Sequence, residues 1–216
     1  MSETAWRRIA HDGSHEIEIR KSRFICTMSR VENDEDARAL IASLKKQYWD
    51  ANHNCSAYII GETASIQRSS DDGEPSGTAG MPMLEVLRKT MLTDTVAVVT
   101  RYFGGTLLGA GGLIRAYGRA VSETIREIGI VERQFLTVVS VLADHAEGGR
   151  LHNALSASAF PEAEVNYEAS GVRFTLHLPE PDIDAFQQWL AETTNGQATA
   201  TTQGHVSIDR PVSLSH

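Results

Sequence analysis

The most constraining feature of this sequence is a glycine-rich segment between a strand pattern and a helix pattern. Residues 101–120 read RYFGGTLLGAGGLIRAYGRA and follow the short, uncharged, β-branched run Thr95–Thr100, which predicts a buried strand. Apolar residues then recur at helical spacing from Leu113 to Val121. The segment therefore predicts a strand, a glycine loop and a helix. The glycines of this loop are Gly104, Gly105, Gly109, Gly111 and Gly112.

Two interpretations of the glycine loop remain. In one, the glycines permit positive φ and a close approach of helix to strand. In the other, the free N–H groups that begin the helix bind a phosphate or carboxylate. The glycine spacing matches neither the dinucleotide nor the P-loop motif. A helix N-terminus contributes about 0.3–1 kcal/mol to anion binding, whereas millimolar affinity needs about 4 kcal/mol. The second interpretation therefore needs the nearby cations Arg101, Arg115 and Arg119.

A second unusual segment, Ser69–Pro82 (SSDDGEPSGTAGMP), is predicted to be a loop, and a helix is predicted to follow it over Met83–Met91. Its carboxylates are Asp71, Asp72 and Glu74. In a functional interpretation they hold a divalent metal or activate water. In a structural interpretation the segment is a polar connection with an Asx-turn at one of its aspartates. Ser76 or Thr78 is then a candidate cap for the helix.

A third candidate is the run His53-Asn54-Cys55. On a strand, His53 and Cys55 share a face, as a nucleophile and its base or half of a metal site would. However, no second Cys/His pair lies at zinc-ligand spacing, and Cys26 lies in a separate predicted strand. Because Cys55 precedes the apolar run Ser56–Ile60, we expect a buried, unreactive thiol.

Four motifs in this order resemble the YigZ/IMPACT family. They are SRF at 22–24, HNCSAY at 53–58, DDGEPSGTAGMP at 71–82 and RYFGGTLLGAGGLIRAYG at 101–118. The resemblance covers roughly the first 130 residues, and its two long motifs are specific. It implies an N-terminal domain of the ribosomal protein S5 domain 2 type. It also implies a ferredoxin-like second domain, similar to domain V of elongation factor G.

The resemblance also implies a role in translation but no catalytic residues. Eukaryotic relatives carry an additional N-terminal RWD domain and regulate translation by binding a partner of an amino-acid-starvation kinase. In this chain the motifs begin at Ser22, so we expect no such domain and do not carry the kinase-regulating role over.

The order of elements predicts an α+β chain of two domains, 1–132 and 133–216. In the second, strands are expected at Phe135–Leu142, Ala163–Ala169, Val172–Leu178 and Gln197–Ile208, and helices at Asp144–Ser156 and Pro181–Thr193. This βαββαβ order is the ferredoxin-like plan and agrees independently with the resemblance. In the first, strands are expected at Glu16–Arg20, Phe24–Val31, Ser56–Ile60 and Ala64–Arg68, and a helix capped by Asn33 at Asp34–Gln47.

Charge is distributed unequally between these domains. Residues 1–132 hold 16 Lys and Arg against 18 Asp and Glu (−2), whereas residues 133–216 hold 4 against 10 (−6). Because nucleic-acid binding depends on neutralising phosphates, we expect any RNA on the first domain. The cations there that we single out are Lys21, Arg23, Arg68, Arg101, Arg115 and Arg119, with Tyr102 and Phe103 as candidates for base stacking. Tyr117 is expected in the core.

The sequence contains no apolar run of 18 residues, and its first residues, MSETAWRRIAHDGS, lack the apolar segment of a signal peptide. Two cysteines in separate predicted strands suit a reducing compartment. We therefore expect a cytoplasmic protein that does not span a membrane.

Three functional hypotheses follow. The first is a non-enzymatic protein that binds RNA, the ribosome or a translation-related partner through the first domain, and in which Arg101→Ala and Arg115→Ala weaken binding without unfolding. The second is an enzyme for a phosphorylated or anionic small molecule, with Mg²⁺ on the acidic segment and His53 as base; this rests on fold-level analogy with small-molecule kinases. The third is an interaction module whose acidic second domain meets a basic protein.

Overall fold

The computed structural model describes residues 6–160 and 162–212, which form two compact units. Residues 6–133 with 209–212 make the first unit, and residues 134–208 make the second. The domain predicted over 133–216 includes residues 209–212, whereas in the structure these residues belong to the first unit. There the Asp209 carboxylate contacts the guanidinium groups of Arg8 and Arg30.

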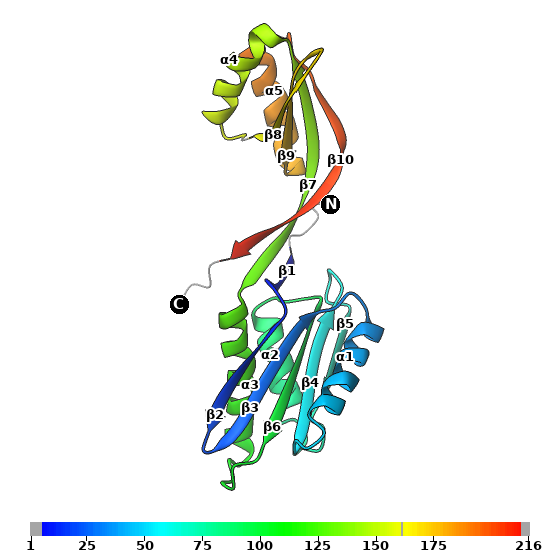
Figure 1. The fold of residues 1–216 in the computed structure, drawn as a ribbon, viewed down its shortest axis with the longest axis vertical. Coiled ribbons are helices and arrows are strands. Elements are labelled where there is room, and N and C mark those ends of the chain that lie inside the picture. The colour runs from blue at the N-terminus through cyan, green and yellow to red at the C-terminus, as the bar shows by residue number, and fades with distance from the viewer. Residues whose placement is uncertain (1–5, 161, 213–216) are drawn as a thin grey trace. The chain divides into compact units, whose positions relative to one another are not determined.

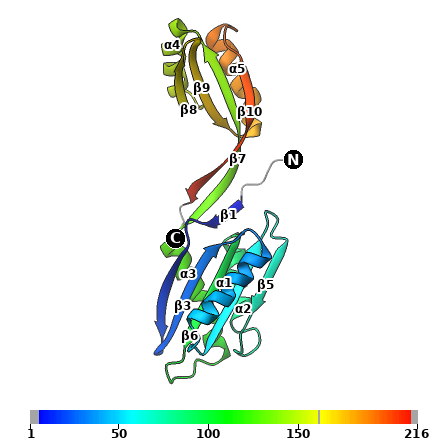
Figure 2. The same cartoon turned by 45° about the vertical axis from the view of Figure 1, so that its right-hand side comes forward.

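The first unit contains a five-stranded antiparallel sheet with the order β2-β3-β6-β4-β5. The strands are β2 (Gly13–Ile19), β3 (Ser22–Arg30), β4 (His53–Ile60), β5 (Ile66–Ser70) and β6 (Thr95–Tyr102). Helix α1 (Asp34–Gln47) covers one face, and helices α2 (Gly80–Lys89) and α3 (Ala110–Ile128) cover the other (Figures 1 and 2). A short strand β1 (Trp6–Ile9) pairs with Ile130–Arg133.

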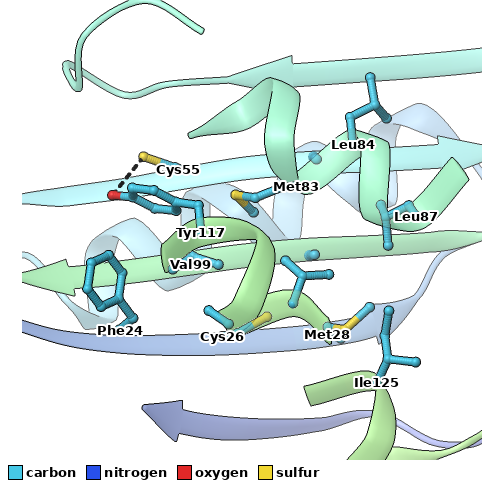
Figure 3. Close-up of a cluster of buried hydrophobic side chains, with 14 of the residues drawn as sticks. Phe24, Cys26, Met28, Cys55, Met83, Leu84, Leu87, Val99, Tyr117 and Ile125 are labelled. Atoms are coloured by element: carbon cyan, nitrogen blue, oxygen red, sulfur yellow. Dashed lines mark hydrogen bonds between the residues drawn. The ribbon is translucent and has the colours of Figure 1, made fainter. Parts of the chain in front are cut away.

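Two apolar layers explain the uncharged strands. The layer beneath α2 and α3 includes Phe24, Met28, Cys55, Met83, Leu87 and Tyr117 (Figure 3). The layer beneath α1 includes Val31, Ala37, Leu44, Tyr58 and Val96. Strand β6 is buried on both faces because helices lie on both sides of it, so its run of β-branched residues needs no alternation.

The second unit is built from most of β7 (Ile130–Ala143), α4 (His145–Ser156), β8 (Glu162–Glu168), β9 (Gly171–Leu178), α5 (Ile183–Thr194) and most of β10 (Ala200–Val212), with a 3₁₀ turn at Glu180–Asp182. The strand order is β8-β9-β7, and β10 also pairs with β7. This order and the βαββαβ succession are those of a ferredoxin-like fold. Its core lies between the sheet and the two helices and includes Val139, Val141, Leu151, Phe174, Phe186 and Leu190. The predicted α+β architecture of two domains is thus confirmed.

The start of α2 differs from the prediction. The helix begins at Gly80 rather than Met83, because the Asp71 side chain accepts hydrogen bonds from the N–H groups of Ala79 and Gly80. Neither predicted cap acts: the N-cap is Ala79, Thr78 Oγ1 donates to the Pro75 carbonyl, and Ser76 is exposed. The Asn33 cap of α1 is confirmed, since its side chain accepts from the N–H of Asp36.

None of the helices within 6–160 and 162–212 is long and apolar enough to cross a membrane.

Candidate functional site

The sequence motifs of the first unit converge at one end of its sheet. The acidic loop (residues 71–79) connects β5 to α2, and the glycine loop (residues 103–109) connects β6 to α3; both lie at the same end of the sheet (Figure 1). His53 at the start of β4 pairs with Arg101 near the end of β6. The β2–β3 turn reaches the same end, because Arg23 pairs with Tyr102.

A buried ion pair joins the acidic loop to strand β6. Arg101 Nη1 lies 2.5 Å from Glu74 Oε1, and the two side chains are 7% and 4% exposed. The hydroxyl of Tyr117, a fully buried core residue as expected, donates to the same oxygen at 2.7 Å. The Arg101 guanidinium carbon also lies 5.4 Å from the ring centroid of Phe24 and 5.7 Å from that of Phe103.

This pair changes the expectation for Arg101. A guanidinium that is buried against a carboxylate is already neutralised, so Arg101 holds the acidic loop to strand β6 and is not an exposed phosphate contact. Removing it would leave Glu74 charged and buried, which is strongly destabilising. The expectation that Arg101→Ala leaves folding intact therefore does not fit the structure.

Each carboxylate of the acidic loop binds a different part of the protein. Asp71 accepts hydrogen bonds from the N–H groups of Gly77, Ala79 and Gly80 at 2.8–3.0 Å. Asp72 contacts Lys45 Nζ at 2.5 Å and the N–H of Asn54 at 2.6 Å. Among the described residues, no three His, Cys, Asp or Glu side chains are grouped as a metal site would require. The three carboxylates thus do not converge on one cation, as the metal interpretation requires.

The environment of Asp71 favours its charged form. Burial raises the pKa of this carboxyl, but hydrogen bonds from three backbone N–H groups lower it by more. The net pKa therefore lies below the usual value. The charged Asp71 side chain therefore stabilises the acidic loop and caps the start of α2.

His53 and Cys55 do not form a nucleophile and base. His53 Nδ1 lies 2.8 Å from the Asp72 carbonyl oxygen, to which it donates, and Nε2 lies 3.9 Å from Glu74 Oε2. The Cys55 thiol donates to the Asp71 carbonyl at 3.0 Å and approaches the Tyr117 hydroxyl at 3.4 Å (Figure 3). Burial raises the pKa of Cys55 to about 12, and that of Cys26 likewise to about 12. Both thiols are protonated and unreactive at neutral pH.

The two interpretations of the glycine loop apply to different glycines. A Cβ at Gly104 would lie 2.0 Å from the Lys21 carbonyl carbon, so this position serves close packing against the β2–β3 turn. Gly105 and Gly109 instead adopt φ of 81° and 70°, and nothing lies within 4 Å of a Cβ placed on either. A Cβ at Gly112 would touch Leu108, whereas the one at Gly111 would meet only the Arg115 side chain.

Helix α3 begins without a side-chain cap from any residue that the structure describes. Gly109 is its N-cap, and the N–H of Leu113 makes the first intrahelical bond to the Gly109 carbonyl, so the N–H groups before it have no partner within the helix. Arg115 is exposed, and its Nη1 would lie 3.6 Å from a Cβ on Gly111, so the side chain folds back over the first turn. Arg119 instead pairs with Glu123 at 2.7 Å.

A pocket of about 440 Å³ lies between the two loops. Its lining residues are Asn52, His53, Glu74, Pro75, Arg101, Phe103, Leu107, Leu108, Gly109, Ala110 and Leu113. Phe103 and Leu107 are 45% and 82% exposed, which is unusual for large apolar side chains. Asn52, Leu107 and Leu108 line the pocket but were not predicted from the sequence. The sequence signal that could have indicated the two leucines is that an apolar pair, Leu107-Leu108, lies inside a glycine loop, where core packing does not require apolar residues.

Comparison with known proteins agrees with this architecture. Residues 20–125 match the Impact N-terminal domain, and residues 141–197 match a domain of unknown function (DUF1949). A solved structure described as an hypothetical protein is 31% identical, with a TM-score of 0.59, and covers 94% of this chain and 98% of its own.

Two bacterial relatives match over most of their length. IMPACT family member YigZ of Escherichia coli is 34% identical over 83% of this chain and 88% of its own. IMPACT family member YvyE of Bacillus subtilis is 53% identical over 86% of this chain and 85% of its own. With that identity across both domains, the chain belongs to the YigZ/IMPACT family.

Proposed function

We propose that this protein is a non-enzymatic, cytoplasmic RNA-binding protein that acts in translation, and that the glycine loop is its contact surface. The observation that carries the proposal is the uncapped start of α3, which follows two open glycines of positive φ and lies under the exposed Arg115 guanidinium. Backbone N–H groups together with a guanidinium suit a phosphate.

Cations around this surface differ in their availability. Lys21 is exposed in the β2–β3 turn, whose backbone packs against Gly104, and Arg115 is exposed on α3. By contrast, Arg23 pairs with Glu16 through two hydrogen bonds, and Arg119 pairs with Glu123. We therefore assign the phosphate contacts to Lys21 and Arg115 and expect smaller contributions from the two paired arginines.

The arrangement offers less support for an enzyme. The carboxylates that would hold Mg²⁺ already bind backbone N–H groups, a lysine and an arginine. His53, which would act as base, has its Nδ1 engaged with the Asp72 carbonyl. Family membership supports the role in translation that the resemblance implies, and the charge of the second domain supports placing RNA on the first.

The test is binding of the purified full chain to ribosomes and to a single-stranded RNA at two salt concentrations. Arg115→Ala and Lys21→Ala should each weaken binding and lower the salt slope by about 0.7 per lost phosphate contact. Arg126→Ala is the matched control, because Arg126 is also exposed on α3 but lies in its last turn. Equal binding by all variants would show that this surface does not contact RNA. If the unaltered protein bound neither RNA nor ribosomes, the proposed RNA-binding function would be wrong.

A further inference from the structure

The pocket beside the glycine loop has three chemically different parts that match the three parts of a nucleotide. This inference rests on the proposed function and specifies its ligand. Among its lining residues, we call Phe103, Leu107 and Leu108 the wall, the acceptors of Glu74 and His53 the floor, and the uncapped start of α3 the rim. The pocket is a concave site with few polar groups, as small-ligand sites usually are.

The wall suits a stacked base. Phe103 is 45% exposed and has the Arg101 guanidinium 5.7 Å from its ring centroid. Its backbone N–H donates to Asn52 Oδ1 at 2.8 Å, which holds the residue in place. Leu107 and Leu108 extend the apolar wall along the loop. Aromatic rings presented in this way bind unpaired bases by stacking, which a base inside a duplex cannot supply.

The floor residues Glu74 and His53 each present a hydrogen-bond acceptor, beside the Arg101 guanidinium, which also lines the pocket. Glu74 Oε1 accepts from Arg101 and Tyr117, whereas Oε2 receives no hydrogen bond from the described residues. His53 Nδ1 donates to a carbonyl, so in the neutral ring Nε2 is an acceptor, and it lies 3.9 Å from Glu74 Oε2. Two acceptors side by side require a ligand edge with adjacent N–H donors.

We infer that this pocket binds one unpaired guanine nucleotide of a single-stranded RNA. The Watson–Crick edge of guanine offers adjacent donors, its N1–H and its N2 amino group, to Glu74 and His53. Adenine, cytosine and uracil each place an acceptor on that edge where the floor needs a donor. The base stacks on Phe103, and its phosphate lies at the start of α3 beside Arg115.

The experiment measures anisotropy of a labelled, U-rich single-stranded RNA with one central guanine. Replacing the guanine by adenine should weaken binding about 5- to 150-fold. Inosine, which lacks the amino group, should fall between them. Phe103→Leu should weaken the guanine RNA about 5- to 150-fold and remove most of the difference between guanine and adenine. Tyr167→Leu, at another exposed aromatic residue, is the control.

The outcomes separate this inference from the function on which it rests. Salt-sensitive binding that is equal for guanine and adenine RNAs, or as tight for a duplex, would overturn the guanine pocket while the RNA-binding function stands. Absence of binding to any RNA and to ribosomes would overturn both. The base replacements require no protein variant, so a folding defect in Phe103→Leu leaves the test intact.

Discussion

The acidic loop and the glycine loop lie at the same end of the sheet and line one pocket, yet they are stabilised in opposite ways. In the acidic loop, Asp71, Asp72 and Glu74 each bind a backbone or side-chain group of the protein. In the glycine loop, Gly105 and Gly109 face open space, and the helix that follows has no side-chain cap. The loop with more ionisable groups is thus the structural one, and the loop with fewer leaves its backbone available to a ligand.

Arg101→Ala should give the largest effect, because it removes the ion pair that holds the acidic loop to strand β6. The buried Glu74 carboxylate would lose its partner, and we expect the free energy of unfolding to fall by about 3–5 kcal/mol. Urea unfolding at pH 7 measures this change. The double variant Glu74→Gln/Arg101→Met should recover much of the loss, since it leaves no buried charge. A loss within 1 kcal/mol in the single variant would show that the acidic loop does not depend on the pair.

Asp71→Asn should destabilise the protein by about 2–3 kcal/mol at neutral pH, because a charge-assisted acceptor of three backbone N–H groups becomes a neutral one. Thermal or urea unfolding checks the magnitude. Asp72→Asn is a matched control for loss of a carboxylate in the same loop, and it should cost less because Lys45 and Asp72 are partly exposed.

The same aspartate predicts a pH dependence. Its pKa is lower in the folded protein than in the unfolded chain, where it is about 3.9. Its contribution is therefore fully present above pH 4 to 5 and is lost as pH falls through the folded pKa. The stability difference between the unaltered protein and Asp71→Asn should shrink on acidification. A difference that stays constant down to pH 3 would contradict this role.

Two glycines at the junction of the glycine loop and α3 provide the smallest and most discriminating comparison. Gly109→Ala forces a Cβ into φ of 70° and should cost about 1–2 kcal/mol, although no atom obstructs it. Gly111→Ala, two residues on and inside α3, should instead stabilise by about 0.4–1 kcal/mol. Paired thermal melts measure both. Equal effects of the same sign would mean that backbone conformation does not distinguish these glycines.

Local signals made much of the first unit predictable. The helix Asp34–Gln47 was predicted with its bounds, because acidic residues begin it, lysines end it and Asn33 caps it. The buried run Thr95–Thr100 predicted β6, which extends two residues further. In both segments the decisive interactions lie within a few residues of one another, so that sequence spacing carries them.

The interactions that define the site are not local. Glu74 and Arg101 are 27 residues apart, and no spacing rule indicates which of three neighbouring carboxylates meets which arginine. Asp71 caps a helix that begins nine residues later, beyond the reach of the usual cap pattern. The four residues of β1 were missed because they show no strand alternation, and they form a strand through pairing with the distant residues Ile130–Arg133.

The ion pair between Arg8 and Asp209 has a consequence for the order in which this protein is made. The two residues lie 201 positions apart, and residues 134–208 are synthesised between them. At about 5–20 residues per second, Asp209 emerges roughly 10–40 s after Arg8. During that interval Arg8 of β1 and Arg30 of β3 are present without this carboxylate. The ion pair between Arg8 and Asp209 in the first unit therefore forms only after residues 134–208 of the second unit have been translated.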